Sequence, residues 1–319
     1  MLSRPLRTSF AALAAAALTL TAACGGGGGA VEEASAGNEL EGASIVVGSK
    51  DFTENIVLGK IAVQLLKAHG ASVTDKTNLG GTVTNRQALQ SGEIDLYWEY
   101  SGTGWIEHLK KTEPIQDSAE QFKATADEDL EKNQIRWIGP TPLNNTYALA
   151  IRSEKAQELG VKTVSDVAEL SRTKPEEVTL CIETEFSTRD DGLPGLLKTY
   201  DMEIPKDRIA LLDTGVVYTE TDKGETCNFG EVFTTDGRIA ALDLTVLEDD
   251  KSFFPLYNAA VTVKEDLYQK HPELEQVFKP VIEKLDDATM QQLNAKVDVD
   301  GMEPGDVTAE WLKENGFLG

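Results

Sequence analysis

The pattern that most constrains the fold is an alternation of strand-like and helix-like segments that begins at Ser44. A β-rich run is followed by a helix with apolar residues three and four positions apart, then by a strand, a helix and a third strand. These segments span residues 44–48, 56–69, 72–78, 82–91 and 94–100. Strands separated by helices at this spacing predict an α/β fold with a parallel sheet, and a second unit of the same kind follows it.

The third strand runs into an aromatic stretch between Asp95 and Trp105. Tyr97, Trp98 and Tyr100 are followed directly by a Ser-Gly-Thr-Gly turn. A strand that stops at a Gly-rich turn delivers its last side chains to the edge of a sheet, where α/β proteins place ligands. The stretch therefore suggests a site for a small ligand, and a core strand with an ordinary turn is the alternative.

The first 23 residues have the pattern of a secretory signal peptide. Arg4 and Arg7 precede a short apolar run, and Thr21-Ala-Ala leads to Cys24, as in a bacterial lipobox with Thr in place of the usual Leu. We expect lipidation of Cys24 and a flexible Gly-rich tether over residues 24–43. The apolar run is shorter than the roughly 18 residues that a membrane-spanning helix needs. The chain is thus predicted to be a domain outside the cytoplasm, attached to the outer face of the cytoplasmic membrane only by its lipid.

Charge and cysteine content exclude several kinds of partner. The formal net charge of −24 argues against nucleic acid and against a grip on anionic lipid. With Cys24 assigned to the anchor, Cys181 and Cys227 remain, and in an oxidising compartment such a pair is more typical of a disulfide than of a metal site. The three histidines lie far apart in the sequence, so we predict no metal site and no cofactor.

Enzyme signatures are absent from the sequence. Ser171-Arg-Thr-Lys174 fits S-x-x-K, but its partner motifs are missing, and there is no nucleophile elbow, Walker loop or Rossmann glycine triplet. We therefore expect no catalytic residue and no enzymatic activity.

A different group of residues points to ligand binding. Aromatic residues stand at strand ends in four distant segments, and single basic residues stand in loops of the same kind. The aromatic residues are Tyr100, Tyr147, Phe233 and Tyr257, and the basic residues are Lys50 and Arg189. A quaternary ammonium has no N–H to donate, so only ring faces can hold it, at about 0.5–2 kcal/mol each. A basic pair would complete such a site by holding a carboxylate.

Seven motifs follow one another along the chain. They are Gly48-Ser-Lys-Asp-Phe-Thr-Glu54, Leu79-Gly-Gly-Thr82, Trp98-Glu-Tyr-Ser-Gly-Thr103, Asn145-Thr-Tyr-Ala148, Arg189-Asp-Asp-Gly-Leu-Pro194, Phe233-Thr-Thr-Asp-Gly-Arg238 and Leu247-Glu-Asp-Asp250. Together they resemble one family, the glycine betaine/carnitine/choline substrate-binding proteins of ABC transporters. The resemblance implies a type II periplasmic-binding fold, with two α/β lobes, two crossing strands and the ligand in the cleft. We expect residues 44–149 plus 251–319 in lobe 1 and residues 150–250 in lobe 2.

The resemblance also implies a role for each site residue. Tyr100, Tyr147, Phe233 and Tyr257 match the aromatic cage that surrounds the ammonium, although Phe233 stands where Tyr is usual. The residues that match the carboxylate clamp are Lys50, Thr103 and Arg189. The implied partners are an ABC permease and its ATPase, with the binding protein itself a monomer.

The basic pair favours a carboxylated ligand. Choline would leave Lys50 and Arg189 facing an empty, partly desolvated pocket, so we expect glycine betaine, proline betaine or carnitine in preference to it. Three alternatives remain, namely a choline-selective binding protein, a sensor lipoprotein without a transport role, and a secreted enzyme on the same scaffold.

Overall fold

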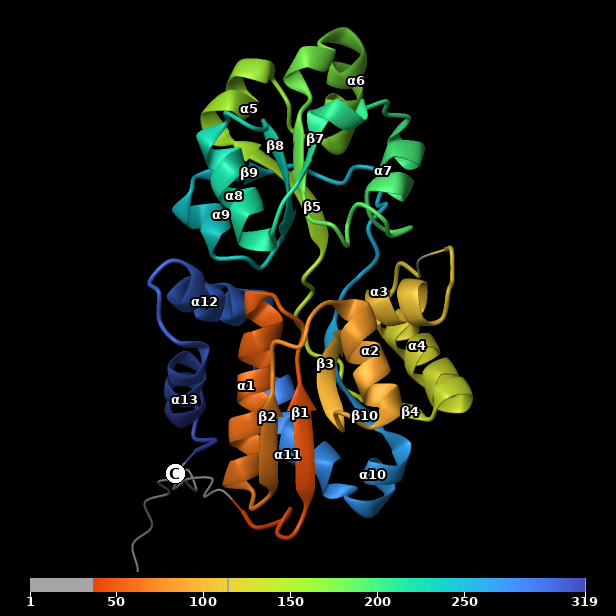
Figure 1. Cartoon of the computed structure of the whole chain (residues 1–319), viewed down its shortest axis with the longest axis vertical. Coiled ribbons are helices and arrows are strands. Elements are labelled where there is room, and N and C mark those ends of the chain that lie inside the picture. The colour runs from red at the N-terminus through yellow and green to blue at the C-terminus, as the bar shows by residue number, and fades with distance from the viewer. Residues whose placement is uncertain (1–36, 114, 319) are drawn as a thin grey trace, which may run out of the picture. The chain divides into compact units, whose positions relative to one another are not determined.

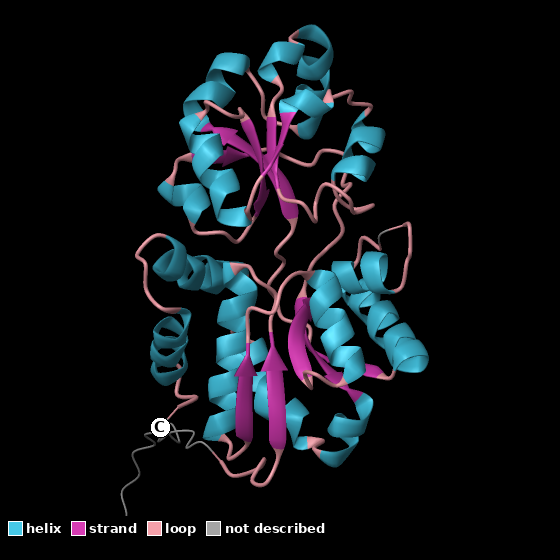
Figure 2. Ribbon diagram, viewed as in Figure 1, coloured by secondary structure: helices cyan, strands magenta, loops and turns pink. Residues whose placement is uncertain are grey.

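The computed structural model describes residues 37–113 and 115–318, and within these ranges the chain forms two five-stranded sheets. The predicted signal peptide, Cys24 and the first part of the predicted tether lie outside the described residues. We use lobe 1 for the sheet with strand order β2-β1-β3-β10-β4 and its helices, and lobe 2 for the sheet with order β7-β6-β8-β5-β9 and its helices (Figure 1). Helices flank the strands of both sheets (Figure 2).

Lobe 1 contains the strand–helix alternation predicted from the sequence. Its strands are β1 (Ser44–Gly48), β2 (Ser72–Lys76), β3 (Leu96–Tyr100), β4 (Ile135–Ile138) and β10 (Ala259–Lys264). Its helical segments are α1 (Thr53–Ala68), α2 (Thr82–Ser91), α3 (Ser101–Thr103), the π-helical turn η1 (Gly104–His108), α4 (Ser118–Asn133), α10 (Glu265–Lys270), α11 (Glu273–Ile282), α12 (Asp287–Asp298) and α13 (Pro304–Glu314). Strand β1 pairs in parallel with both β2 and β3, as the sequence predicts, whereas β10 is antiparallel to its neighbours β3 and β4.

Lobe 2 repeats this arrangement with shorter strands. Its strands are β5 (Tyr147–Arg152), β6 (Leu180–Ile182), β7 (Ile209–Leu211), β8 (Phe229–Phe233) and β9 (Leu244–Val246). Its helical segments are α5 (Ser153–Leu159), α6 (Val164–Thr173), η2 (Pro175–Glu177), α7 (Leu193–Tyr200), η3 (Lys206–Arg208), α8 (Thr214–Lys223) and α9 (Arg238–Ala241). Strand β6 is parallel to β7 and β8, and β5 is antiparallel to β8 and β9.

The chain passes between the lobes twice, as the resemblance implies. It leaves lobe 1 after β4 and returns between β9 and β10, and an isolated bridge pairs Asn144 with Asn258 where the two passages run side by side. Strand β5 already starts at Tyr147, so the lobe boundary expected after residue 149 falls inside this strand. The boundary at residues 250–251 falls in the returning passage.

Helix α1 shows why the first lobe folds as it does. Its apolar residues at helical spacing, including Val57, Leu58, Ile61 and Leu65, are fully buried against the sheet and neighbouring helices. Each such side chain contributes roughly 1.5–3 kcal/mol through burial. No helix in the described part of the chain is both long and apolar enough to cross a membrane.

Candidate functional site

A cavity of about 620 Å³ lies at the ends of strands from both lobes. Its lining includes all of the ligand-binding residues predicted from the sequence. These are Lys50, Tyr100, Thr103, Tyr147, Arg189, Phe233 and Tyr257. They come from segments up to about 200 residues apart, and the fold brings them together because β1, β3 and β8 end at this cavity and β5 begins there.

Aromatic rings form a continuous wall of the cavity. The ring of Tyr147 lies 5.2 Å from that of Phe233 and 5.5 Å from that of Tyr257, measured between centroids. The wall contains a fifth ring that the sequence-based site did not include, Phe52, which stacks on Phe233 at 5.1 Å and on Tyr100 at 6.1 Å. Phe52 stands two residues after Lys50 in the motif Gly48-Ser-Lys-Asp-Phe-Thr-Glu54, and this shared motif is the sequence feature that could have identified it as a site residue.

A buried carboxyl group fixes the Tyr100 end of the wall. The Tyr100 hydroxyl donates to Glu54 Oε1 at 2.9 Å, and Asn145 Nδ2 donates to the same oxygen at 2.9 Å. The other oxygen of Glu54 accepts hydrogen bonds from Thr235 and Asn294. Burial raises the pKa of the Glu54 carboxyl, and these neutral donors lower it only in part. The network ties α1 to β3, to the first passage between the lobes, to the loop after β8 in lobe 2 and to α12.

The tyrosines of the wall remain neutral phenols around pH 7. Burial raises the pKa of Tyr100, Tyr147 and Tyr257 well above the usual value for a phenol, and the neighbouring carboxylates Glu54 and Asp191 raise those of Tyr100 and Tyr257 further. Neutral rings keep the negative π face that attracts a cation.

Lys50 is already neutralised by an internal carboxylate. Its Nζ lies 2.6 Å from Glu99 Oε1, and it donates to Thr82 Oγ1 at 2.9 Å. Glu99 is fully buried and also bonds His108 Nε2 and the Tyr97 hydroxyl, both at 2.9 Å. Burial would raise the pKa of the Glu99 carboxyl, but the charge of Lys50 and the contact with His108 hold it well below its usual range. Glu99 is therefore a permanent anion beneath the cavity wall.

Arg189 is neutralised as well. Its Nε and Nη2 bind the two carboxylate oxygens of Asp191 at 2.7 and 2.5 Å, and Nη1 donates to Glu185 Oε1 at 2.8 Å. Asp191 also accepts a hydrogen bond of 2.7 Å from the Tyr257 hydroxyl. The loop that carries Arg189 turns tightly at Gly192, where a Cβ atom would lie 2.1 Å from the carbonyl oxygen of Phe186. The glycine of the Asp-Gly-Leu-Pro motif is thus needed to place Arg189.

The structure corrects one step of the sequence-based reasoning. Choline would not leave two unpaired cations in the cavity, because Glu99 neutralises Lys50 while Asp191 and Glu185 neutralise Arg189. The charges of the two basic residues therefore give no preference for a carboxylated ligand by themselves.

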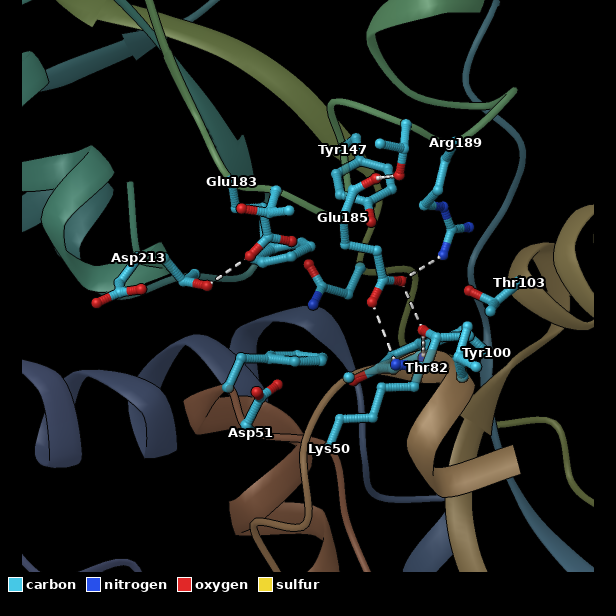
Figure 3. Close-up of a pocket in the computed structure, with 18 of the residues that line it drawn as sticks. Lys50, Asp51, Thr82, Tyr100, Thr103, Tyr147, Glu183, Glu185, Arg189 and Asp213 are labelled. Atoms are coloured by element: carbon cyan, nitrogen blue, oxygen red, sulfur yellow. Dashed lines mark hydrogen bonds and ion pairs between the residues drawn. The ribbon is translucent and has the colours of Figure 1, made fainter. Parts of the chain in front are cut away.

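Acidic residues that the sequence-based site did not include also line the cavity. They are Asp51, Glu183, Glu185 and Asp213 (Figure 3). Glu183 Oε2 accepts from Thr214 Oγ1 at 2.6 Å, whereas Glu185 extends from lobe 2 to Thr82 at the start of α2 in lobe 1. Four carboxylates against two ion-paired cations make the cavity suited to a ligand that carries a positive charge.

A disulfide holds strand β6, which leads directly into the loop that carries Glu183 and Glu185. It joins Cys181 in β6 to Cys227, the pair predicted from the sequence, with the two Cα atoms 5.7 Å apart. No cluster of three or more potential metal-ligating side chains occurs within residues 37–113 and 115–318.

Comparisons with known proteins agree on one family. The OpuAC family model, described as the substrate-binding domain of ABC-type glycine betaine transport systems, matches residues 43–314. A glycine-betaine-binding protein of Pseudomonas aeruginosa is 39% identical over 283 residues, which cover 87% of this chain and 90% of that protein. The glycine betaine-binding protein YehZ of Escherichia coli is 35% identical over 292 residues, which cover 89% of this chain and 95% of that protein.

A solved structure extends the agreement to the fold. The crystal structure of a glycine betaine/carnitine/choline ABC transporter protein is 29% identical and superimposes with a TM-score of 0.70. The match covers 86% of this chain and 100% of the solved one. The two-lobe periplasmic-binding fold predicted from the sequence is thereby confirmed.

Proposed function

Because this chain belongs to the family of substrate-binding domains of ABC-type glycine betaine transport systems, we propose that it captures a quaternary ammonium solute for import. The observation that carries the proposal is the aromatic wall, in which the rings of Phe52, Tyr100, Tyr147, Phe233 and Tyr257 all face one cavity. At about 0.5–2 kcal/mol for each ring that contacts the ammonium, several rings supply much of the roughly 8 kcal/mol of micromolar binding.

Glycine betaine is the first ligand to test. Two relatives at 39% and 35% identity carry it in their names, and this support is independent of the charges in the cavity. Proline betaine and carnitine have the same combination of ammonium and carboxylate, and we place them next and choline last. Thr103 lines the cavity and is a hydroxyl donor for a ligand carboxylate.

We propose binding without catalysis. The described lining of the cavity contains rings, hydroxyl groups, carboxylates, one amide and the two ion-paired cations, but no histidine, cysteine or serine that would form a nucleophile–base pair. The partners in this proposal are a permease and an ATPase, and the binding protein acts as a monomer outside the cytoplasm with Cys24 as its lipid anchor.

Calorimetric titration of the purified protein with glycine betaine, carnitine and choline tests the proposal. We expect glycine betaine to bind with a Kd in the micromolar range and Tyr147→Ala to weaken binding at least tenfold, because the ring of Tyr147 contacts those of Phe233 and Tyr257. Absence of heat with all three compounds, for a protein that melts cooperatively, would rule out a quaternary ammonium ligand.

The anchor needs its own test. Metabolic labelling with a tagged fatty acid should label the natural chain and leave Cys24→Ser unlabelled. Release of that variant into the medium or periplasm would follow, since the lipid is its only proposed membrane attachment. Equal labelling of both proteins would disprove lipidation at Cys24.

A further inference from the structure

The carboxylate of Glu185 lies in the cavity and binds groups from both lobes (Figure 3). Thr82 donates to it twice, from its backbone N at 3.1 Å and from its Oγ1 at 2.6 Å. Arg189 Nη1 donates to it at 2.8 Å. The Glu185 side chain is 32% exposed, whereas that of Asp191, the other anion on Arg189, is 3% exposed. Glu185 is thus the counter-ion of Arg189 that can move without opening the core.

The groups around Glu185 form a site for any carboxylate. Thr82 is the first residue of the ten-residue helix α2, whose N-cap Gly81 supplies no side-chain cap, so the helix start offers its backbone N–H donors and a positive dipole end to an anion such as Glu185. A Cβ atom on Gly81 would lie 2.8 Å from Glu185 Oε2, so the glycine makes room for the anion. Lys50 Nζ adds a second cation behind Thr82 Oγ1.

The electrostatics of Glu185 agree with this geometry. Burial raises the pKa of its carboxyl, but the charges of Lys50 and Arg189 and the hydrogen bonds from Thr82 outweigh that effect and hold the pKa below its usual value. An ionised carboxylate is what this subsite stabilises.

We propose that Glu185 is an internal stand-in for a ligand carboxylate and that it determines which ammonium compounds this cavity selects. A zwitterion such as glycine betaine binds by displacing Glu185 from Thr82 and Arg189. Choline has no carboxylate and binds with Glu185 in place, where the negative charge helps to balance its ammonium. The inference rests on the proposed function and identifies the residue that sets the ligand preference of the same site.

The competition follows from the chemistry of the subsite. Two carboxylates cannot share one arginine nitrogen and one helix start without strong repulsion, so every zwitterion that enters must break the bonds that Glu185 makes. Removal of the Glu185 charge should therefore help zwitterions and give no such help to choline. Replacement of a residue that only holds the lobes together would change the Kd values of both ligands by the same factor.

Paired titrations test the proposal with Glu185→Gln and a matched control. Glu183→Gln removes the same charge two residues away on the same loop, at a side chain bound to Thr214 instead of Thr82 and Arg189. In Glu185→Gln we expect the Kd of glycine betaine to fall about tenfold, equivalent to about 1.4 kcal/mol, while that of choline stays constant or rises. In Glu183→Gln the two Kd values should change by one common factor. A common factor in Glu185→Gln as well would overturn the proposal.

A second measurement needs no ammonium ligand. In Glu185→Ala the subsite is vacated, so acetate should raise the Tm in a saturable way, whereas acetamide should not, because it lacks the charge. The natural protein and Glu183→Ala should show no such rise. Absence of an acetate effect in Glu185→Ala would overturn the anion subsite. An acetate effect in a protein that binds no quaternary ammonium would instead retain the subsite and disprove the proposed function.

Discussion

The two cations that line the cavity are neutralised in different ways. Lys50 in lobe 1 pairs with Glu99, a carboxylate with no exposed surface that is fixed by three further contacts. Arg189 in lobe 2 shares its charge between buried Asp191 and partly exposed Glu185. A counter-ion behind the wall stabilises the fold, whereas one inside the cavity can exchange with a ligand. The same type of ion pair therefore serves structure at one position and selectivity at the other.

The largest test of this contrast is Glu99→Gln. The amide would leave the buried Lys50 without its permanent anion, and loss of one partner from a buried pair costs about 3–5 kcal/mol. Glu185→Gln should cost less than about 1 kcal/mol, because its carboxylate is partly exposed and Arg189 keeps Asp191. Urea unfolding of both variants without ligand measures the difference. Equal losses would show that the two counter-ions have the same structural role.

Acid unfolding provides a control for the Glu99 prediction. The pKa of Glu99 is depressed in the folded protein, so its stabilising effect is complete above the unfolded-state pKa of about 4.3 and is lost as the pH falls through the lower folded value. Glu99→Gln should lack this part of the pH dependence. Parallel stability curves for the variant and the natural protein below pH 4 would contradict the assignment.

Removal of the disulfide should lower the stability of lobe 2 and leave the ligand preference of the site unchanged. Replacement of Cys181 and Cys227 by serine opens a covalent loop with a sequence separation of 46 residues, and we expect a loss of about 2–4 kcal/mol. The ratio of the Kd values for choline and glycine betaine should not change, because neither cysteine lines the cavity. Thermal melts and titrations of the double variant check both parts. A changed ratio of Kd values would mean that ligand selectivity depends on the disulfide next to the loop that carries Glu185.

Removal of one ring should change the free energy of ligand binding by less than the Glu99 and disulfide variants change the free energy of unfolding. Phe52→Ala removes one ring that stacks on Phe233 and Tyr100, which should weaken glycine betaine and choline alike by about 2- to 30-fold, since both carry the same ammonium. Phe253→Ala is a matched control, because Phe253 is a half-buried phenylalanine that packs on Phe254 outside this cavity. If Phe52→Ala affects only one of the two ligands, the rings contribute to selectivity as well as affinity.

Strand ends and motif residues were predictable from the sequence, and ion pairing was not. Tyr100 and Arg189 stand next to glycine-rich turns, and such turns place side chains at the ligand edge of an α/β sheet. Whether Arg189 is free or paired depends on Asp191 and Glu185, whose side chains meet it only when the loop folds back at Gly192. Phe52 was missed for a similar reason, because its stacking on Phe233 joins segments about 180 residues apart.

The smallest predicted effect is a pH dependence of selectivity. Because the pKa of Glu185 lies below its usual value, this carboxylate is ionised at pH 7 and protonates only as the pH falls below about 4.5. The carboxylate of glycine betaine stays ionised to lower pH, since its own ammonium is adjacent. Protonated Glu185 competes less well for Thr82 and Arg189, so the preference for glycine betaine over choline should rise by a few-fold as the pH falls further below about 4.5. Burial raises the pKa of the Glu183 carboxyl, but a change in its charge acts on the ammonium of both ligands alike and cancels in the ratio. Titrations at several pH values should show the rise in the natural protein and its absence in Glu185→Gln. The same rise in that variant would assign the effect to another group and remove the distinction between the fixed and the replaceable counter-ion.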